Sequence, residues 1–239
     1  MFIEEKNINK ENLDTYFKEL AKEYRKLIGK KMNAEIILIG GAAIIESYDF
    51  RDMTNDIDAI INASSAIKDA INTVGDKYNL PKGWINTDFQ RTSSYSNKLL
   101  QYSIFYKTYY HVLDIRIVKG EYLIAMKLRA FRKYKNDLSD IVGIVMEHYN
   151  NGDIITMDRV EKAVLNLYDS WDEFPVGAKN FITNLLSNRN YRDIFNLTKQ
   201  NEKEAKDNLL EFDKKYPEIL KESNVDNILQ NLKKRNDKK

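Results

Sequence analysis

The chain has 239 residues, with 38 basic and 36 acidic side chains, a formal net charge of +2 and no cysteine. The absence of cysteine excludes disulfides, thiolate nucleophiles and zinc–thiolate sites, and it fits a reducing compartment. The nearly balanced charge gives no overall signature of nucleic-acid binding. The N-terminal segment is charged, and no window approaches the roughly 18 uninterrupted apolar residues of a membrane helix. We therefore expect a cytoplasmic protein that does not enter a membrane.

The first half of the chain shows both helical and strand patterns. Apolar residues at steps of three and four predict an amphipathic opening helix: Leu13, Phe17, Leu20, Tyr24 and Leu27. Short runs rich in β-branched or aromatic residues predict strands at residues 35–39, 57–63, 102–106 and 111–118. A short helix can start directly after Gly41, and residues 64–78 have helical spacing with serines as candidate caps.

The second half of the chain has helical patterns. Residues 120–149 read as helix nearly throughout, with a break expected near Asn136. The polar cluster "YNNGD" at 149–153 is the clearest boundary signal, and helical stripes continue beyond it. The sequence thus predicts an α+β fold, with one domain over residues 1–149 and an α-helical domain over residues 150–239.

The stretch "GGAAIIESYDFRDMTNDID", residues 40–58, carries a pair of aspartates. Side chains alternate in a strand, so Asp56 and Asp58 point to the same side with Cα atoms about 6.5–7 Å apart. Carboxylates so placed repel each other unless cations lie between them, and they can hold one divalent metal or a pair. The alternative is an ordinary solvated strand face.

Gly40 and Gly41 end the apolar run that precedes these aspartates. Glycine lets the backbone approach a phosphate closely, and a following short helix would direct its first N–H groups at the same anion. Thr54 could add a hydroxyl hydrogen bond. A Gly-Gly turn alone is a common structural feature, but in this order the turn and the aspartates would bring phosphate and metal together.

The stretch "LIGGAAII…RDMTNDIDAII" resembles the signature of the polymerase-beta-like nucleotidyltransferase superfamily: a hydrophobic strand, Gly-Gly, a spacer, and Asp-x-Asp. The form with Thr54, Asp56 and Asp58 is similar to toxin-type members, including the nucleotidyltransferase toxins of abortive-infection type E (AbiE) systems. The resemblance covers roughly residues 35–145 and implies a nucleotidyltransferase-type mixed sheet with flanking helices. It also implies Mg²⁺ or Mn²⁺ as cofactor and a nucleoside triphosphate (NTP) as substrate.

The resemblance implies further site residues. The superfamily adds a third carboxylate from a neighbouring strand, for which Asp114 is the candidate; an ion pair with Arg116 is the alternative. Toxin-type families carry a similar lysine implicated in contacting nucleotide phosphates, for which Lys127 is the candidate; a lysine that extends its charged end to water is the alternative. Asp137 and Asp140 correspond to a downstream acidic element, or they serve as helix caps and ion-pair partners.

The implied reaction moves a nucleoside monophosphate (NMP) to an acceptor hydroxyl. Asp56, Asp58 and Asp114 would hold metal, while Gly40, Gly41, Thr54 and Lys127 would bind the nucleotide. The toxin resemblance implies an RNA acceptor, such as a tRNA 3′ end, and a cognate antitoxin as partner. Basic residues that fit RNA, or simply a solvated surface, are Arg129, Arg132, Lys133, Lys135, Lys233, Lys234 and Arg235. The alternatives are transfer to an antibiotic and a catalytically inactive binding module.

Overall fold

The computed structural model describes residues 8–29, 32–221 and 224–236, and the chain divides into two compact units. The first unit comprises Met1–Met126 and Asp158–Asp172, and the second comprises Lys127–Met157 and Glu173–Lys239. The predicted α+β fold is confirmed. The predicted domain division after residue 149 stays a prediction. Within the described residues, no helix is long and apolar enough to cross a bilayer.

The first unit is built on a mixed five-stranded sheet. Its strands, in spatial order, are β5 (Ile85–Asn86), β4 (Ile57–Asn62), β2 (Ala34–Leu38), β7 (Leu113–Val118) and β6 (Ser103–Tyr109). Strand β2 pairs antiparallel with β4 and parallel with β7, so the carboxyl end of β2 lies beside the start of β4. A separate two-stranded sheet joins β1 (Ile8–Asn9) to β3 (Met53–Thr54).

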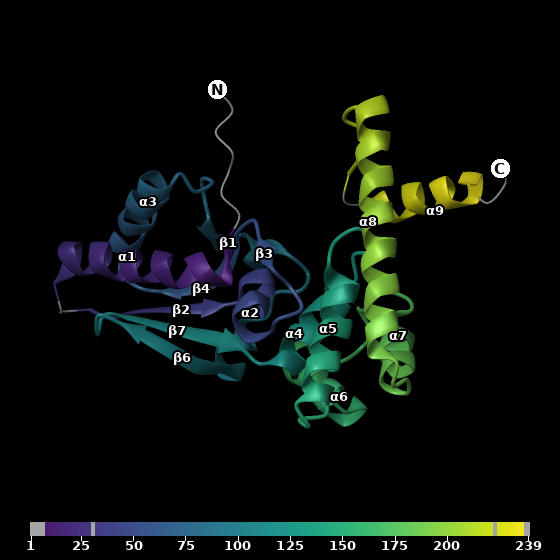
Figure 1. The fold of residues 1–239 in the computed structure, drawn as a ribbon, viewed down its shortest axis with the longest axis horizontal. Coiled ribbons are helices and arrows are strands. Elements are labelled where there is room, and N and C mark those ends of the chain that lie inside the picture. The colour runs from purple at the N-terminus through teal and green to yellow at the C-terminus, as the bar shows by residue number, and fades with distance from the viewer. Residues whose placement is uncertain (1–7, 30–31, 222–223, 237–239) are drawn as a thin grey trace. The chain divides into compact units, whose positions relative to one another are not determined.

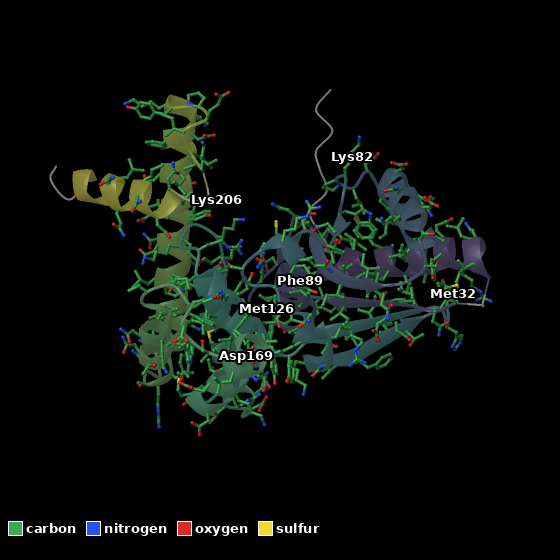
Figure 2. All side chains as sticks on the ribbon, turned by 180° about the vertical axis from the view of Figure 1, so that it is seen from behind. Met32, Lys82, Phe89, Met126, Asp169 and Lys206 are labelled. Carbon is green, nitrogen blue, oxygen red and sulfur yellow. The ribbon has the colours of Figure 1, made fainter. Side chains whose placement is uncertain are left out.

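Helices α1 (Lys10–Ile28) and α3 (Ala66–Tyr78) lie together on one face of the five-stranded sheet (Figure 1). Side chains fill the layer between them and the strands (Figure 2). Trp84 is buried in this layer and donates its indole N–H to the Ile71 carbonyl at 3.0 Å. A Cβ on Gly75 of α3 would lie 3.2 Å from the Trp84 ring, so the absence of a side chain there lets the indole approach the helix.

The remaining elements of the first unit are two short turns between β5 and β6 and the helices that pack near them. Two 3₁₀ turns, η1 (Asp88–Arg91) and η2 (Asn97–Tyr102), precede β6. Helix α6 (Met157–Tyr168) is tied to this region by the Ser96 hydroxyl, which donates to the Leu167 carbonyl at 2.9 Å. Tyr122 of α4 (Gly120–Ala130) stacks on Tyr102 with ring centroids 4.1 Å apart.

The sequence patterns predicted most elements correctly. The opening helix, the four strands, the short helix α2 (Gly40–Ser47) and α3 are present at the predicted positions. The expected break near Asn136 is a turn that spans residues 131–136, between α4 and α5 (Asp137–Asn150). The prediction that serines cap α3 was wrong for Ser65, which occupies the N-cap position but makes no side-chain capping hydrogen bond.

The second unit is helical and is organised around the contact between α5 and α8 (Tyr191–Lys215). Helices α7 (Ala178–Leu186) and α9 (Val225–Asn236) complete it. Glu202 of α8 is only 4% exposed and accepts the N–H groups of Leu138 and Ser139 at 2.8 and 3.3 Å. Asn136 at the N-cap of α5 makes no side-chain capping bond, so Glu202 supplies the acceptor that the start of α5 needs.

The buried carboxyl group of Glu202 has an altered acidity. Burial raises the pKa of Glu202 to about 7, although the N–H bonds at the start of α5 oppose the rise and the charge of Asp140 adds to it. The second carboxyl oxygen, Oε2, is buried and has no hydrogen-bond partner among the residues that the structure describes. Because the folded pKa lies above the reference value of 4.5, the folded protein binds this proton more tightly than the unfolded chain does.

We expect the stability to depend on pH through Glu202. Its contribution is fully present below pH 4.5 and is lost as the pH rises through about 7, at a cost of up to about 3 kcal/mol. Glu202→Gln, which resembles the protonated acid, should match the wild type at pH 4 and be more stable at pH 8. Urea unfolding across this range measures the difference, with the exposed Glu204→Gln on the same helix as control. Parallel pH curves for wild type and Glu202→Gln would contradict this assignment.

Candidate nucleotide-binding site

The site begins where β2 runs into α2. Gly40, the first residue of α2, has φ +56°, a conformation that glycine adopts readily and other residues adopt with strain. The Ile39 N–H donates to the Asp58 carbonyl at 3.0 Å, which brings the start of β4 beside this turn. A Cβ on Gly40 would lie 3.2 Å from Asp58 Oδ2. The carboxylate of Asp58 therefore lies directly over the glycine turn.

The second glycine leaves room for another pair of side chains. A Cβ on Gly41 would lie 2.5 Å from Thr54 Oγ1 and 2.9 Å from the Arg51 guanidinium. Thr54 is buried, and Arg51 Nε donates to the Met53 carbonyl at 3.1 Å. The structure thus gathers Gly40, Gly41, Thr54 and Asp58 as the sequence motif predicts, and it adds Arg51.

Arg51 lies at the candidate site, and the sequence analysis did not predict it there. Its position three residues before Thr54, inside the motif, was the available signal, because a cation beside carboxylates and a Gly-Gly turn suits a phosphate. The N-cap residue of α2 is Ile39, whose side chain cannot accept a hydrogen bond from the first turn. The guanidinium of Arg51 and the uncapped N–H groups at the start of α2 therefore lie together, and such a place suits an anion.

The two carboxylates lie at the start of β4. Asp58 is within the strand and partly buried, whereas Asp56 precedes the strand and is exposed. Asn86 of β5 donates from Nδ2 to Asp56 Oδ2 at 3.1 Å. Magnesium is commonly held by one or two carboxylates with phosphate oxygens and water as the other ligands, so this donor set fits Mg²⁺ or Mn²⁺. Across the described part of the chain, no group of three or more acidic, histidine or cysteine side chains is arranged for a metal.

Asp114 lies at the opposite end of the sheet from these carboxylates. In the parallel pairing of β2 with β7, Asp114 is level with Glu35, whereas Asp58 is level with Ile39 at the other end of β2. Four residues of strand separate the two levels, or about 13 Å. The structure therefore does not bring Asp114 together with Asp56 and Asp58, contrary to the expectation of a three-carboxylate site.

The local partners of Asp114 also differ from the alternative prediction, an ion pair with Arg116. The Thr108 hydroxyl of β6 donates to Asp114 Oδ1. Arg116 donates from Nε to the Ser103 hydroxyl at 2.8 Å and lies 3.8 Å from a carboxylate oxygen of Glu35. The described contacts of Asp114 are thus with the neighbouring strand rather than with Arg116.

Lys127 belongs to the second unit, where it forms two ion pairs. Its Nζ lies 3.2 Å from Asp137 Oδ1 and 2.7 Å from Asp140 Oδ2, and both aspartates are buried. Burial alone would raise the pKa of Asp137, but the charge of Lys127 and the hydrogen bonds from Arg132 outweigh it and lower the pKa to about 2. Asp137 and Asp140 thus act as ion-pair partners of Lys127, and its contact with nucleotide phosphates stays a prediction.

The basic residues suggested for RNA binding are not one continuous helical face. Arg129 of α4 pairs with Glu173, and Arg132 pairs with Asp137 at 2.8 Å. Lys133 and Lys135 lie exposed in the turn between α4 and α5. The side chains of Lys233, Lys234 and Arg235 lie outside the described part of the chain.

A strand, a Gly-Gly turn, a helix and a strand opening at Asp-x-Asp, assembled on a mixed sheet, define a protein of the nucleotidyltransferase type. A family model described as "Nucleotidyltransferase of unknown function (DUF6036)" matches residues 15–194, and the chain belongs to this family. The family supports nucleotidyl transfer as the general activity and a transferase as the class of enzyme. Neither a curated protein nor a solved structure matches the chain.

We expect Gly41→Ala to destabilise the protein. A Gly→Ala change within a helix ordinarily stabilises by up to about 1 kcal/mol. Here the new methyl group would overlap Thr54 Oγ1, and overpacking of this kind costs about 1–3 kcal/mol. Urea unfolding of Gly41→Ala measures the sign of the change. In a Thr54→Ala background, where the overlapping oxygen is absent, we expect the same change to cost less; equal costs in both backgrounds would contradict the contact.

Proposed function

We propose that the first unit binds a Mg²⁺–NTP complex and transfers its NMP to a hydroxyl at the 3′ end of an RNA such as a tRNA. One observation carries the proposal: the carboxylate of Asp58 lies over Gly40 at the same turn where Arg51 and Thr54 lie over Gly41. A metal-binding carboxylate and an anion-binding turn are thus adjacent. Nucleotidyl transfer requires both, because the triphosphate must be held while charge develops on it.

Each residue has a separate part in the proposal. The Gly40–Gly41 turn and Arg51 bind phosphate oxygens, the turn through backbone N–H groups and Arg51 through its guanidinium. Thr54 fixes the turn from its buried position beside Gly41. Asp56 and Asp58 would hold the metal ion, which when bound neutralises phosphate charge.

The acceptor hydroxyl then attacks the α-phosphorus in line. A new bond forms between its oxygen and the α-phosphorus, the bond from that phosphorus to the bridging oxygen breaks, and pyrophosphate leaves. The hydroxyl proton passes to solvent. The RNA acceptor and a role as the toxin of a toxin–antitoxin or abortive-infection pair are supported by the resemblance of the Thr54–Asp58 motif to toxin-type members. An antitoxin protein would then be a partner.

Labelled transfer tests the proposal. Purified protein is incubated with Mg²⁺, each α-labelled NTP in turn and total RNA, and label at RNA 3′ ends is measured. We expect transfer by the wild type and a loss of about 10²–10³-fold or more in Asp58→Asn, because the substitution removes a negative charge that would hold the metal ion. Asp69→Asn, an exposed aspartate of α3, should retain full activity.

Asp114→Asn separates a two-carboxylate site from a three-carboxylate site. Its position at the far end of the sheet predicts transfer within a few-fold of the wild type. A loss of transfer as large as that of Asp58→Asn would show that Asp114 is a third carboxylate of the site. Transfer to an aminoglycoside or lincosamide but not to RNA would contradict the RNA acceptor and identify an antibiotic as the acceptor instead. Absence of transfer, together with no thermal stabilisation by Mg²⁺–NTP, would leave a binding module.

Arg51 should determine NTP affinity. Removing a charged hydrogen-bond donor from a phosphate costs about 1.5–3 kcal/mol, so Arg51→Ala should raise the NTP KM by about 10–100-fold. Arg51→Lys keeps the charge but loses the planar guanidinium, so its NTP KM should lie between those of the wild type and Arg51→Ala. Arg25→Ala, in the last turn of α1, is the matched control. An unchanged KM in Arg51→Ala would exclude phosphate binding by this residue.

A further inference from the structure

Asn86 contacts Asp56 from outside the sequence motif. It lies in β5, and the parallel pairing of β4 with β5 sets Asn86 level with Asp58. The Ile57 N–H donates to the Trp84 carbonyl at 2.8 Å, which fixes the start of β4 against this strand. Asn86 is thereby placed beside both carboxylates, although about thirty residues separate it from them along the chain.

The orientation of the Asn86 amide follows from its neighbours. The Asp88 N–H can only donate, and it points to Asn86 Oδ1 at 2.9 Å, so this oxygen must be the acceptor. The amide nitrogen then faces the other way, where it lies 3.1 Å from Asp56 Oδ2 and 3.4 Å from the Gly83 carbonyl. The amide is therefore held on both sides and presents an N–H to Asp56.

Asp56 needs such a partner more than Asp58 does. Asp58 is within β4 and lies against Gly40, whereas Asp56 is exposed and precedes the strand. An exposed side chain at a strand entrance samples several rotamers, and holding one of them has an entropic cost. A neutral amide can fix the carboxylate without neutralising it, so the negative charge that attracts a cation is kept.

We propose that Asn86 is a positioning residue that orients the Asp56 carboxylate for the divalent metal by occupying Oδ2 and leaving Oδ1 for the ion. The inference rests on the proposed function, because it assigns metal binding to Asp56. It extends the site from the motif at residues 40–58 to β5. Groups that orient a metal ligand typically change metal affinity by about 10–100-fold when removed.

Direct Mn²⁺ binding tests the role of Asn86 without relying on turnover. Mn²⁺ is titrated into the full-length protein with a non-hydrolysable NTP analogue, and free Mn²⁺ is measured by electron paramagnetic resonance. We expect Asn86→Ala to raise the Mn²⁺ Kd about tenfold, the lower end of that range because the contact is exposed. Asn62→Ala, an exposed asparagine at the other end of β4, should bind as the wild type does.

A double-mutant cycle separates orientation of Asp56 from support of the loop around Gly83 and Asp88. If Asn86 acts through Asp56, Asn86→Ala should have no further effect on the Mn²⁺ Kd in an Asp56→Asn background. The same loss in both backgrounds would overturn the inference and leave the proposed function standing. Wild-type protein that binds no Mn²⁺ would overturn both. Asn86→Leu, close in size to asparagine, replaces Asn86→Ala if thermal unfolding shows that the alanine variant does not fold.

Discussion

The close approach of the backbone at Gly40 and Gly41 to the side chains of β3 and β4 is the contact on which the site depends. A methyl group at Gly41 would overlap Thr54, and one at Gly40 would press on Asp58. Because Gly40 and Gly41 have no side chains, three groups can meet at one turn: the uncapped start of α2, the guanidinium of Arg51 and the carboxylate of Asp58. Groups of opposite charge are thus held side by side, which suits a ligand that is itself anionic phosphate joined to a cation.

The strand register places Asp114 away from the two motif carboxylates. Because β2 is parallel to β7, the residue of β7 nearest to Asp58 lies at the carboxyl end of β7, and Asp114 lies near its start. A two-carboxylate site relies on phosphate oxygens and water to complete the coordination of Mg²⁺. Metal binding and NTP binding would then be coupled, since each supplies ligands or charge to the other. The amide of Asn86 adds orientation without adding charge.

The second unit shows a different use of buried charge. Lys127 and Arg132 face Asp137 and Asp140, so two cations and two carboxylates balance in its interior. Glu202 is a further buried carboxyl group that accepts the N–H groups at the start of α5, and burial raises its pKa to about 7, with the charge of Asp140 adding to the rise. The hydrogen bonds from Leu138 and Ser139 to Glu202 join the start of α5 to α8. The two cations and two carboxylates serve internal pairing in this unit.

The amino-acid pattern was sufficient to predict the helices, the strands and the glycine–aspartate motif. Apolar periodicity located α1, β2, β4 and the helices of the second half, because burial of one face imposes a local repeat. The order of Gly40, Gly41, Thr54, Asp56 and Asp58 predicted that these residues would meet, since a tight turn joins consecutive elements. The pattern did not predict that Asp114 lies apart, that Arg51 lies over Gly41 or that Asn86 contacts Asp56; these features follow from the folded chain. Strand register and the pairing of β5 depend on contacts between distant residues, and a local pattern carries no information about which distant partner is chosen or at which level.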